Sequence, residues 1–175
     1  MSFQNPYWIM NKMINETKKR RYMLSASLKY DVTKWLNVTG RVKVDNADMD
    51  ITNKRYAGTD TNFAGEKGLY NIEKRNDRQI YADAIANVDL YFADDYHLTA
   101  NVGGSIKDVQ MDLMGWGGDL RKIPNFFSIT NISTTSYKER EDGSHVQSQS
   151  VFANVELSWK SMLYLTVTGR NDWES

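Results

Sequence analysis

The segment Met114–Asp119, Met-Gly-Trp-Gly-Gly-Asp, holds the residue types in this chain that best suit ligand contact. A Trp side chain framed by glycines offers an aromatic face that stacks on a sugar ring or touches a partner protein. Charged and aromatic residues follow soon after it. We predict ligand or partner contact by five residues, namely Trp116, Asp119, Arg121, Phe126 and Phe127. The alternative is a Trp that packs its own loop in place.

Motifs for catalysis or metal binding are missing from the sequence. There is no G-x-S-x-G, no Walker phosphate loop and no paired-carboxylate motif. Cysteine is absent, and the histidines His97 and His145 have no carboxylates arranged around them at ligand spacing. We therefore predict no enzyme activity, no catalytic residue, no metal site and no cofactor.

The remaining charges suit ion pairs between neighbouring strands. We expect three carboxylates to pair across strands with four basic residues. The carboxylates are those of Asp83, Asp89 and Glu156, and the basic residues are Lys29, Arg41, Lys43 and Arg170.

Composition narrows the class of protein. The charges of the 22 basic and 22 acidic residues cancel, and a net charge of zero argues against a nucleic-acid binder. The content of 12% aromatic residues argues against a disordered chain. No run approaches the roughly 18 apolar residues of a membrane helix. At 175 residues, the length is that of one domain.

Three stretches of the chain repeat one hairpin pattern of strand, tight polar turn and strand. They are Leu28–Arg41, Leu90–Gly103 and Leu157–Arg170. The connections between the hairpins are much longer than the turns within them. Short turns at one end of a sheet and long loops at the other are typical of a transmembrane β-barrel wall.

Side chains alternate with period two along six predicted strands, so that one face is apolar and the other polar. Small Ala and Gly residues are common on the apolar face, where a packed protein core would be poorly filled but lipid chains adapt. We predict that this face meets lipid through Leu28, Val38, Val42, Ala84, Ala86, Leu98, Val155 and Leu165.

Aromatic residues gather near the three hairpin turns. Such a girdle marks the interface between a membrane and water. We assign to it Tyr30, Trp35, Tyr91, Tyr96, Trp159 and Tyr164. The alternative is a soluble all-β binding module that presents two long loops, because the strands of a soluble sandwich alternate equally well.

The sequence therefore predicts an all-β fold of six antiparallel up-and-down strands, forming part of a barrel wall, or an open curved sheet if alone. The predicted strands cover about residues 22–31, 36–45, 78–92, 96–106, 146–159 and 163–170. Long extracellular loops are expected at about 48–76 and 107–145.

Several segments, in order along the chain, resemble the barrel region of the SusC/RagA family of TonB-dependent transporters. Three of these are Asn5-Pro6-Tyr7-Trp8, the later Asn15-Glu16 with the basic run Lys18 to Arg21, and Tyr30-Asp31-Val32-Thr33-x-Trp35-Leu36 with Gly40-Arg41. The others are Pro124-Asn125-x-x-Ser128 and Leu163-Tyr-Leu-Thr-Val-Thr-Gly-Arg-Asn-Asp-Trp173, which is the most specific.

The resemblance implies a bacterial outer-membrane receptor barrel that imports oligosaccharides or peptides. Its partners would be outer-membrane lipid, a SusD-type lipoprotein and the TonB complex. The sequence shows no signal peptide, plug domain, TonB-contacting box or terminal barrel strand of that family. We therefore expect an internal fragment of the barrel that does not transport alone.

Overall fold

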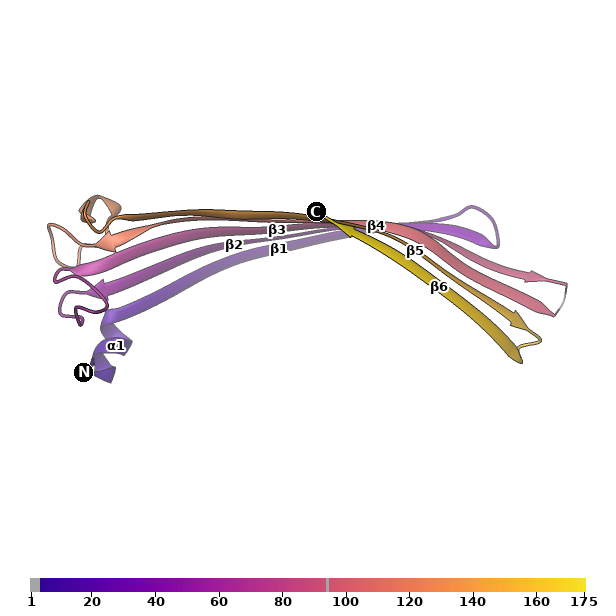
Figure 1. Cartoon of the computed structure of the whole chain (residues 1–175), viewed down its shortest axis with the longest axis horizontal. Helices are drawn as coiled ribbons and strands as arrows, with labels where there is room; N and C mark the ends of the chain where they lie inside the picture. The colour runs from indigo at the N-terminus through magenta and orange to yellow at the C-terminus, as the bar shows by residue number, and fades with distance from the viewer. Residues whose placement is uncertain (1–3, 94) are drawn as a thin grey trace. The chain divides into compact units, whose positions relative to one another are not determined.

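A computed structural model describes residues 4–93 and 95–175 of the chain (Figure 1). Six strands form one open sheet in the sequential order β1-β2-β3-β4-β5-β6. The predicted fold class, six antiparallel up-and-down strands, is confirmed. Asp94, which belongs to the turn of the second predicted hairpin, lies outside the described residues.

The strands are β1 (Met13–Asp31), β2 (Leu36–Tyr56), β3 (Gly68–Phe92), β4 (Tyr96–Asp119), β5 (Lys138–Trp159) and β6 (Leu163–Glu174). Their ends at the three hairpin turns coincide with the predicted ones. In the third turn, Lys160 and Ser161 take positive φ angles of 52° and 54°, a conformation that matches the twist of the flanking strands.

The predicted boundaries of the two long loops were wrong, because both loops are much shorter than expected. Residues 57–67 separate β2 from β3, and residues 120–137 separate β4 from β5, so most of the predicted 48–76 and 107–145 is strand. The strands continue where the alternation of apolar and polar side chains stops. Main-chain hydrogen bonds hold a ladder whatever the side chains are, so a hydrophobicity pattern does not detect these extensions.

The chain divides into two compact units, and every strand from β1 to β5 runs through both. The band unit comprises residues 22–46, 78–110 and 145–175, and it holds the three hairpins. The loop unit comprises the chain up to Arg21, residues 47–77 and residues 111–144. The division falls close to the point where the apolar face ends on each strand.

In the band unit, contacts between neighbouring strands confirm which residues share the polar face. Arg41 bonds Asp83, and Asn87 donates to Asn37 at 2.9 Å. The register of β5 and β6 sets apolar residues opposite each other on the other face, including Val155 opposite Val167. The two faces are therefore chemically distinct.

The described residues of the band unit form no hydrophobic core between the strands. Among the described residues no large side chain is fully buried, and the buried apolar side chains all belong to the loop unit: Ala47, Ala64, Leu113, Leu120 and Ile132. The apolar face is open instead, with Leu28 76% exposed and Leu165 63% exposed.

A short helix, α1 (Pro6–Lys12), precedes β1. The sequence pattern that could have predicted it is Asn5-Pro6. The Asn5 side chain accepts a hydrogen bond from the Tyr7 amide at 2.9 Å, and proline is favoured in the first turn of a helix. Within residues 4–93 and 95–175, the structure contains no helix long and apolar enough to cross a bilayer.

Candidate functional site

The five predicted contact residues do not lie on one loop. Trp116 and Asp119 belong to β4, so their placement in a loop was wrong, whereas Arg121, Phe126 and Phe127 do lie in the loop of residues 120–137. Trp116 is half-buried and borders a recess of the loop unit. The structure therefore places two of these residues on a strand and three in the loop that follows it.

The loop of residues 120–137 is built around one buried amide. The Asn131 side chain is enclosed, with the residue 4% exposed. Its Oδ1 accepts from the amides of Lys122 and Ile123 at 2.9 and 3.1 Å. Its Nδ2 donates to the carbonyls of Ile123 and Phe126 at 2.7 and 2.9 Å. Four bonds from one side chain fix the path of this loop.

The two loops of the loop unit are bonded to each other. Asp119 Oδ1 accepts from the Gly65 amide at 2.8 Å, and Lys67 Nζ donates to the Arg121 carbonyl at 2.8 Å. Asn125 Oδ1 accepts from the Ala57 amide at 2.7 Å. Asp119 thus has a structural role, and its carboxylate already has a protein donor.

Phe127 and Phe126 differ in what they contact. The Phe127 ring lies 4.9 Å from the Tyr56 ring and 5.9 Å from the Tyr70 ring, while the Lys54 ammonium lies 5.7 Å above its centre. Phe126 is 52% exposed. Phe127 therefore packs its own loop down, and Phe126 presents its ring to the surroundings.

Helix α1 is attached to the loop of residues 57–67 by Trp8. Its indole N–H donates to Thr59 Oγ1 at 3.0 Å, and its ring lies against Gly58. Gly58 has a φ of 95°, which favours glycine, and an added Cβ there would meet the Trp8 ring at 3.0 Å. The helix and both loops thus form one connected assembly.

Two glycines are among the residues that line the recess beside Trp116. Gly115 and Gly117 line it, together with polar side chains that include Asn71 and Arg140. A Cβ added at Gly117 would overlap the Asn71 amide, so only glycine fits there. Near this recess, partial burial raises the pKa of the Tyr137 hydroxyl, and the Glu139 carboxylate adds to the rise.

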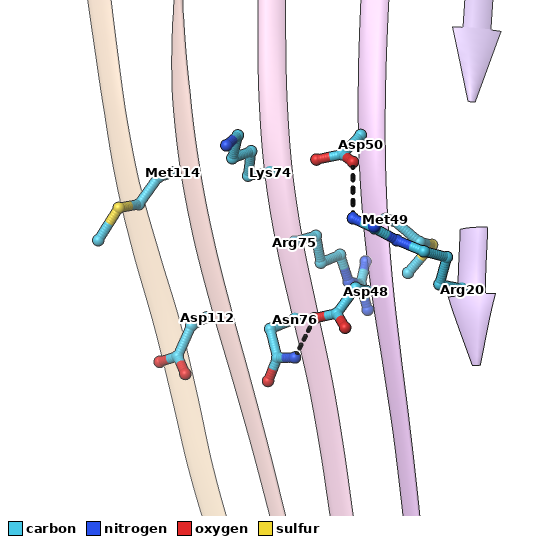
Figure 2. Close-up of a pocket in the computed structure, with 9 residues that line it drawn as sticks. All are labelled: Arg20, Asp48, Met49, Asp50, Lys74, Arg75, Asn76, Asp112 and Met114. Carbon is cyan, nitrogen blue, oxygen red and sulfur yellow. Dashed lines mark hydrogen bonds and ion pairs between the residues drawn. The ribbon is translucent and has the colours of Figure 1, made fainter. Parts of the chain in front are cut away.

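A second recess of the loop unit carries both signs of charge (Figure 2). Arg20 donates to Asp50 at 3.4 Å, and Asn76 donates to Asp48 at 2.6 Å. Lys74 belongs to β3, the strand next to the β2 residues Asp48 and Asp50. Among the described residues, no group of three or more metal-ligating side chains is assembled, here or elsewhere.

The predicted lipid-facing residues all share one face of the sheet by alternation. Leu28, Val38, Val42, Ala84, Val155 and Leu165 are exposed, and Ala86 and Leu98 are half-exposed. The aromatic residues near the turns are exposed as well, but they divide between faces. Tyr91 stacks on His97 at 4.0 Å on the polar face, whereas Tyr96 stacks on Phe92 at 5.4 Å on the apolar face.

The other aromatic residues of the predicted girdle follow the same division. Tyr164 lies opposite Ser158 on the polar face, and Trp159 lies opposite Leu163 on the apolar face. By alternation Tyr30 shares the apolar face, and Trp35 stands in the first turn.

The expected ion pairs form in part. Arg41 pairs with Asp83 as predicted, at 3.0 Å. Four of the other charged side chains find different partners: Asp89 bonds His97, Glu156 accepts from Thr166, Lys29 pairs with Asp31, and Arg170 pairs with Asp172. The prediction was wrong for these four residues and for Lys43, which forms no ion pair among the described residues. Lys29 and Arg170 pair within their own strands, whereas Asp89 and Glu156 bond a His and a Thr of the neighbouring strand and not the expected basic residues.

The fold, as described so far, is an open sheet of sequentially ordered antiparallel strands with one apolar and one polar face. No protein-family model and no curated protein matches the sequence. Solved structures that match the fold include the RagAB peptide transporter, with a TM-score of 0.86, and the RagAB peptide importer in its "open-open" and "closed-closed" states, each with 0.88.

Sequence identity to these three structures is 15–16%, so the likeness concerns the fold. The matches cover 97–99% of this chain. The chain spans about a fifth of the matched chains, 19% in each case.

Proposed function

We propose that this chain is a six-stranded section of the wall of a bacterial outer-membrane β-barrel. The observation that carries the proposal is the exposed apolar face of the band unit, opposite a polar face with bonded charges. In a barrel, the first face meets lipid and the second faces the interior. Large exposed apolar surfaces on proteins mark contact with a membrane or a partner, and a lipid bilayer would cover the whole apolar face of this sheet.

The length of the apolar face supports this proposal. On β2 it runs from Leu36 to Val44, about nine residues, and a membrane-spanning β-strand needs about 9–11. Beyond Val44 the same face carries Asn46, Asp48 and Asp50. The apolar length of β2 thus matches a bilayer, and these three polar residues follow where the apolar stretch ends.

We further propose that the barrel is a TonB-dependent receptor of the SusC/RagA type that imports oligosaccharides or peptides. In such an importer the partners are a SusD-type lipoprotein and the TonB complex. The resemblance of the sequence segments and the fold similarity to a peptide transporter both support this. A section of this size does not transport alone, and its role is not enzymatic.

The alternative function, a soluble all-β binding module, has less support. A soluble module needs a core in which large apolar side chains are buried. Among the described residues, none of that kind is fully buried, and residues such as Leu28 are largely exposed. No observation of the structure favours the soluble module specifically.

The test is a pair of arginine substitutions on opposite faces. Ala84→Arg places a charge on the apolar face, which costs about 2–4 kcal/mol at the middle of a bilayer. Asn101→Arg places the same charge on the polar face as the matched control. The chain is folded into lipid vesicles and unfolded with urea. We expect loss of stability for Ala84→Arg only; equal tolerance of both variants would rule out the lipid-facing assignment.

A further inference from the structure

A recess in the polar face of the band unit brings together five side chains that can donate hydrogen bonds. It measures about 470 Å³, and its polar lining residues are Ser25, Ser27, Arg41, Lys43 and Tyr81, which come from β1, β2 and β3. Ala26 and Val42, which lie between them in the sequence, complete the lining. By alternation, the five side chains lie on one face. The recess thus combines a guanidinium, an ammonium and three hydroxyl groups.

Arg41 is held in position by a buried carboxylate. Its Nε donates to both oxygens of Asp83, at 3.0 and 3.1 Å, and the Asp83 side chain is 0% exposed. The Arg41 side chain is 53% exposed. Its two Nη groups form no hydrogen bond with any residue that the structure describes. Because a guanidinium presents pairs of donors in a fixed plane, an oriented Arg41 is prepared for a planar oxyanion.

Lys43 supplies a second positive charge two residues along the same strand. It makes no ion pair or hydrogen bond within residues 4–93 and 95–175. Asp45, the next residue on this face, has an interaction partner of its own. Since Asp83 offsets the charge of Arg41, Lys43 gives the recess a net positive charge.

We propose that this recess binds the carboxylate of an acidic peptide, with Arg41 and Lys43 as charged donors and the hydroxyls completing the site. The inference rests on the proposed function, in which the polar face lines the interior of a barrel that imports oligosaccharides or peptides. It adds a chemical class of ligand and the residues that select it.

The experiment compares two capped peptides that carry the same neutral fluorophore. One contains two Glu residues and the other two Gln residues at the same positions, so that only the side-chain carboxylates differ. Binding to the chain folded in detergent micelles is measured by fluorescence anisotropy. We expect the Glu peptide to bind at least about tenfold more tightly, as one lost charged hydrogen bond implies.

Two lysine variants test whether the recess carries this preference. Lys43→Gln is expected to weaken binding of the Glu peptide about tenfold. Lys29→Gln removes the same charge from the same face, but Lys29 pairs with Asp31 at 3.5 Å and lies outside the recess. It is expected to leave the affinity unchanged. Arg41 is not substituted, because its loss would leave Asp83 buried without a partner.

A hydroxyl variant provides a second measurement. Tyr81→Phe keeps the ring and removes one donor, with an expected weakening of about threefold. Far-UV circular dichroism checks that every variant is folded.

Three outcomes would overturn the proposal: equal binding of the two peptides, equal loss in both lysine variants, or displacement of the peptide by inorganic phosphate at far lower concentration than by glutarate. The last outcome would assign the recess to a phosphate-bearing ligand. Each of these leaves the barrel proposal standing if Ala84→Arg still behaves as expected, so the two failures are distinguishable.

Discussion

Substitution of Asn131 by Ala should release the loop of residues 120–137 while leaving the rest of the sheet folded. The variant removes four hydrogen bonds between the Asn131 side chain and the loop backbone. Each bond contributes about 1 kcal/mol net, and water replaces part of that at the exposed Lys122 and Ile123. We therefore expect a loss of about 3 kcal/mol in the local stability of the loop.

Hydrogen exchange measures this loss directly. The amides of Lys122 and Ile123 donate to Asn131, so their exchange should accelerate about a hundredfold in the variant. Thr134→Ala, an exposed substitution in the same loop, serves as the control. Unchanged protection of both amides in Asn131→Ala would show that the loop is held by something other than this side chain.

Two further substitutions test how tightly the strands and the helix are held. Gly103→Ala would place a Cβ 2.7 Å from a carbonyl oxygen and 2.9 Å from an aromatic ring, and should cost about 1–3 kcal/mol in urea unfolding. Gly169→Ala meets nothing within 4 Å and should change stability by less than about 0.5 kcal/mol; equal costs would contradict the close approach at Gly103. Trp8→Phe removes the indole bond to Thr59 and should weaken the attachment of α1 by about 1 kcal/mol, seen as faster exchange of the helix amides. The exposed Trp173→Phe should leave those amides unaffected, and an identical response would refute the role of Trp8.

The hairpins were predictable because their signals are local. Polar turn residues and the return of alternation after them place the strand ends at Asp31 and Leu36, and at Trp159 and Leu163, where the structure has them. The choice of apolar face followed from the same alternation. Both features depend on neighbours in the sequence.

The candidate site was predictable only in part. Arg121 and Phe126 are exposed on the loop of residues 120–137, and their contact with a ligand or partner stays a prediction. Asp119 and Phe127, by contrast, are engaged in holding the loop unit together. Their partners come from residues that are distant in sequence, and no pattern of residue types identifies which amide or ring will be the neighbour.

The sequence by itself determined the six strands, their antiparallel order and the face of each that is apolar. The tertiary structure decided how far the strands run and how the two loops and α1 are joined. It also decided that Lys43 has no partner among the described residues, while Arg41 is oriented by Asp83. The physical reason is the range of the forces involved. The alternation of apolar and polar side chains depends on each residue and its neighbours in the sequence, because one side of the strand faces an apolar medium. Main-chain ladders and long-range hydrogen bonds depend instead on which distant groups the folded chain brings together.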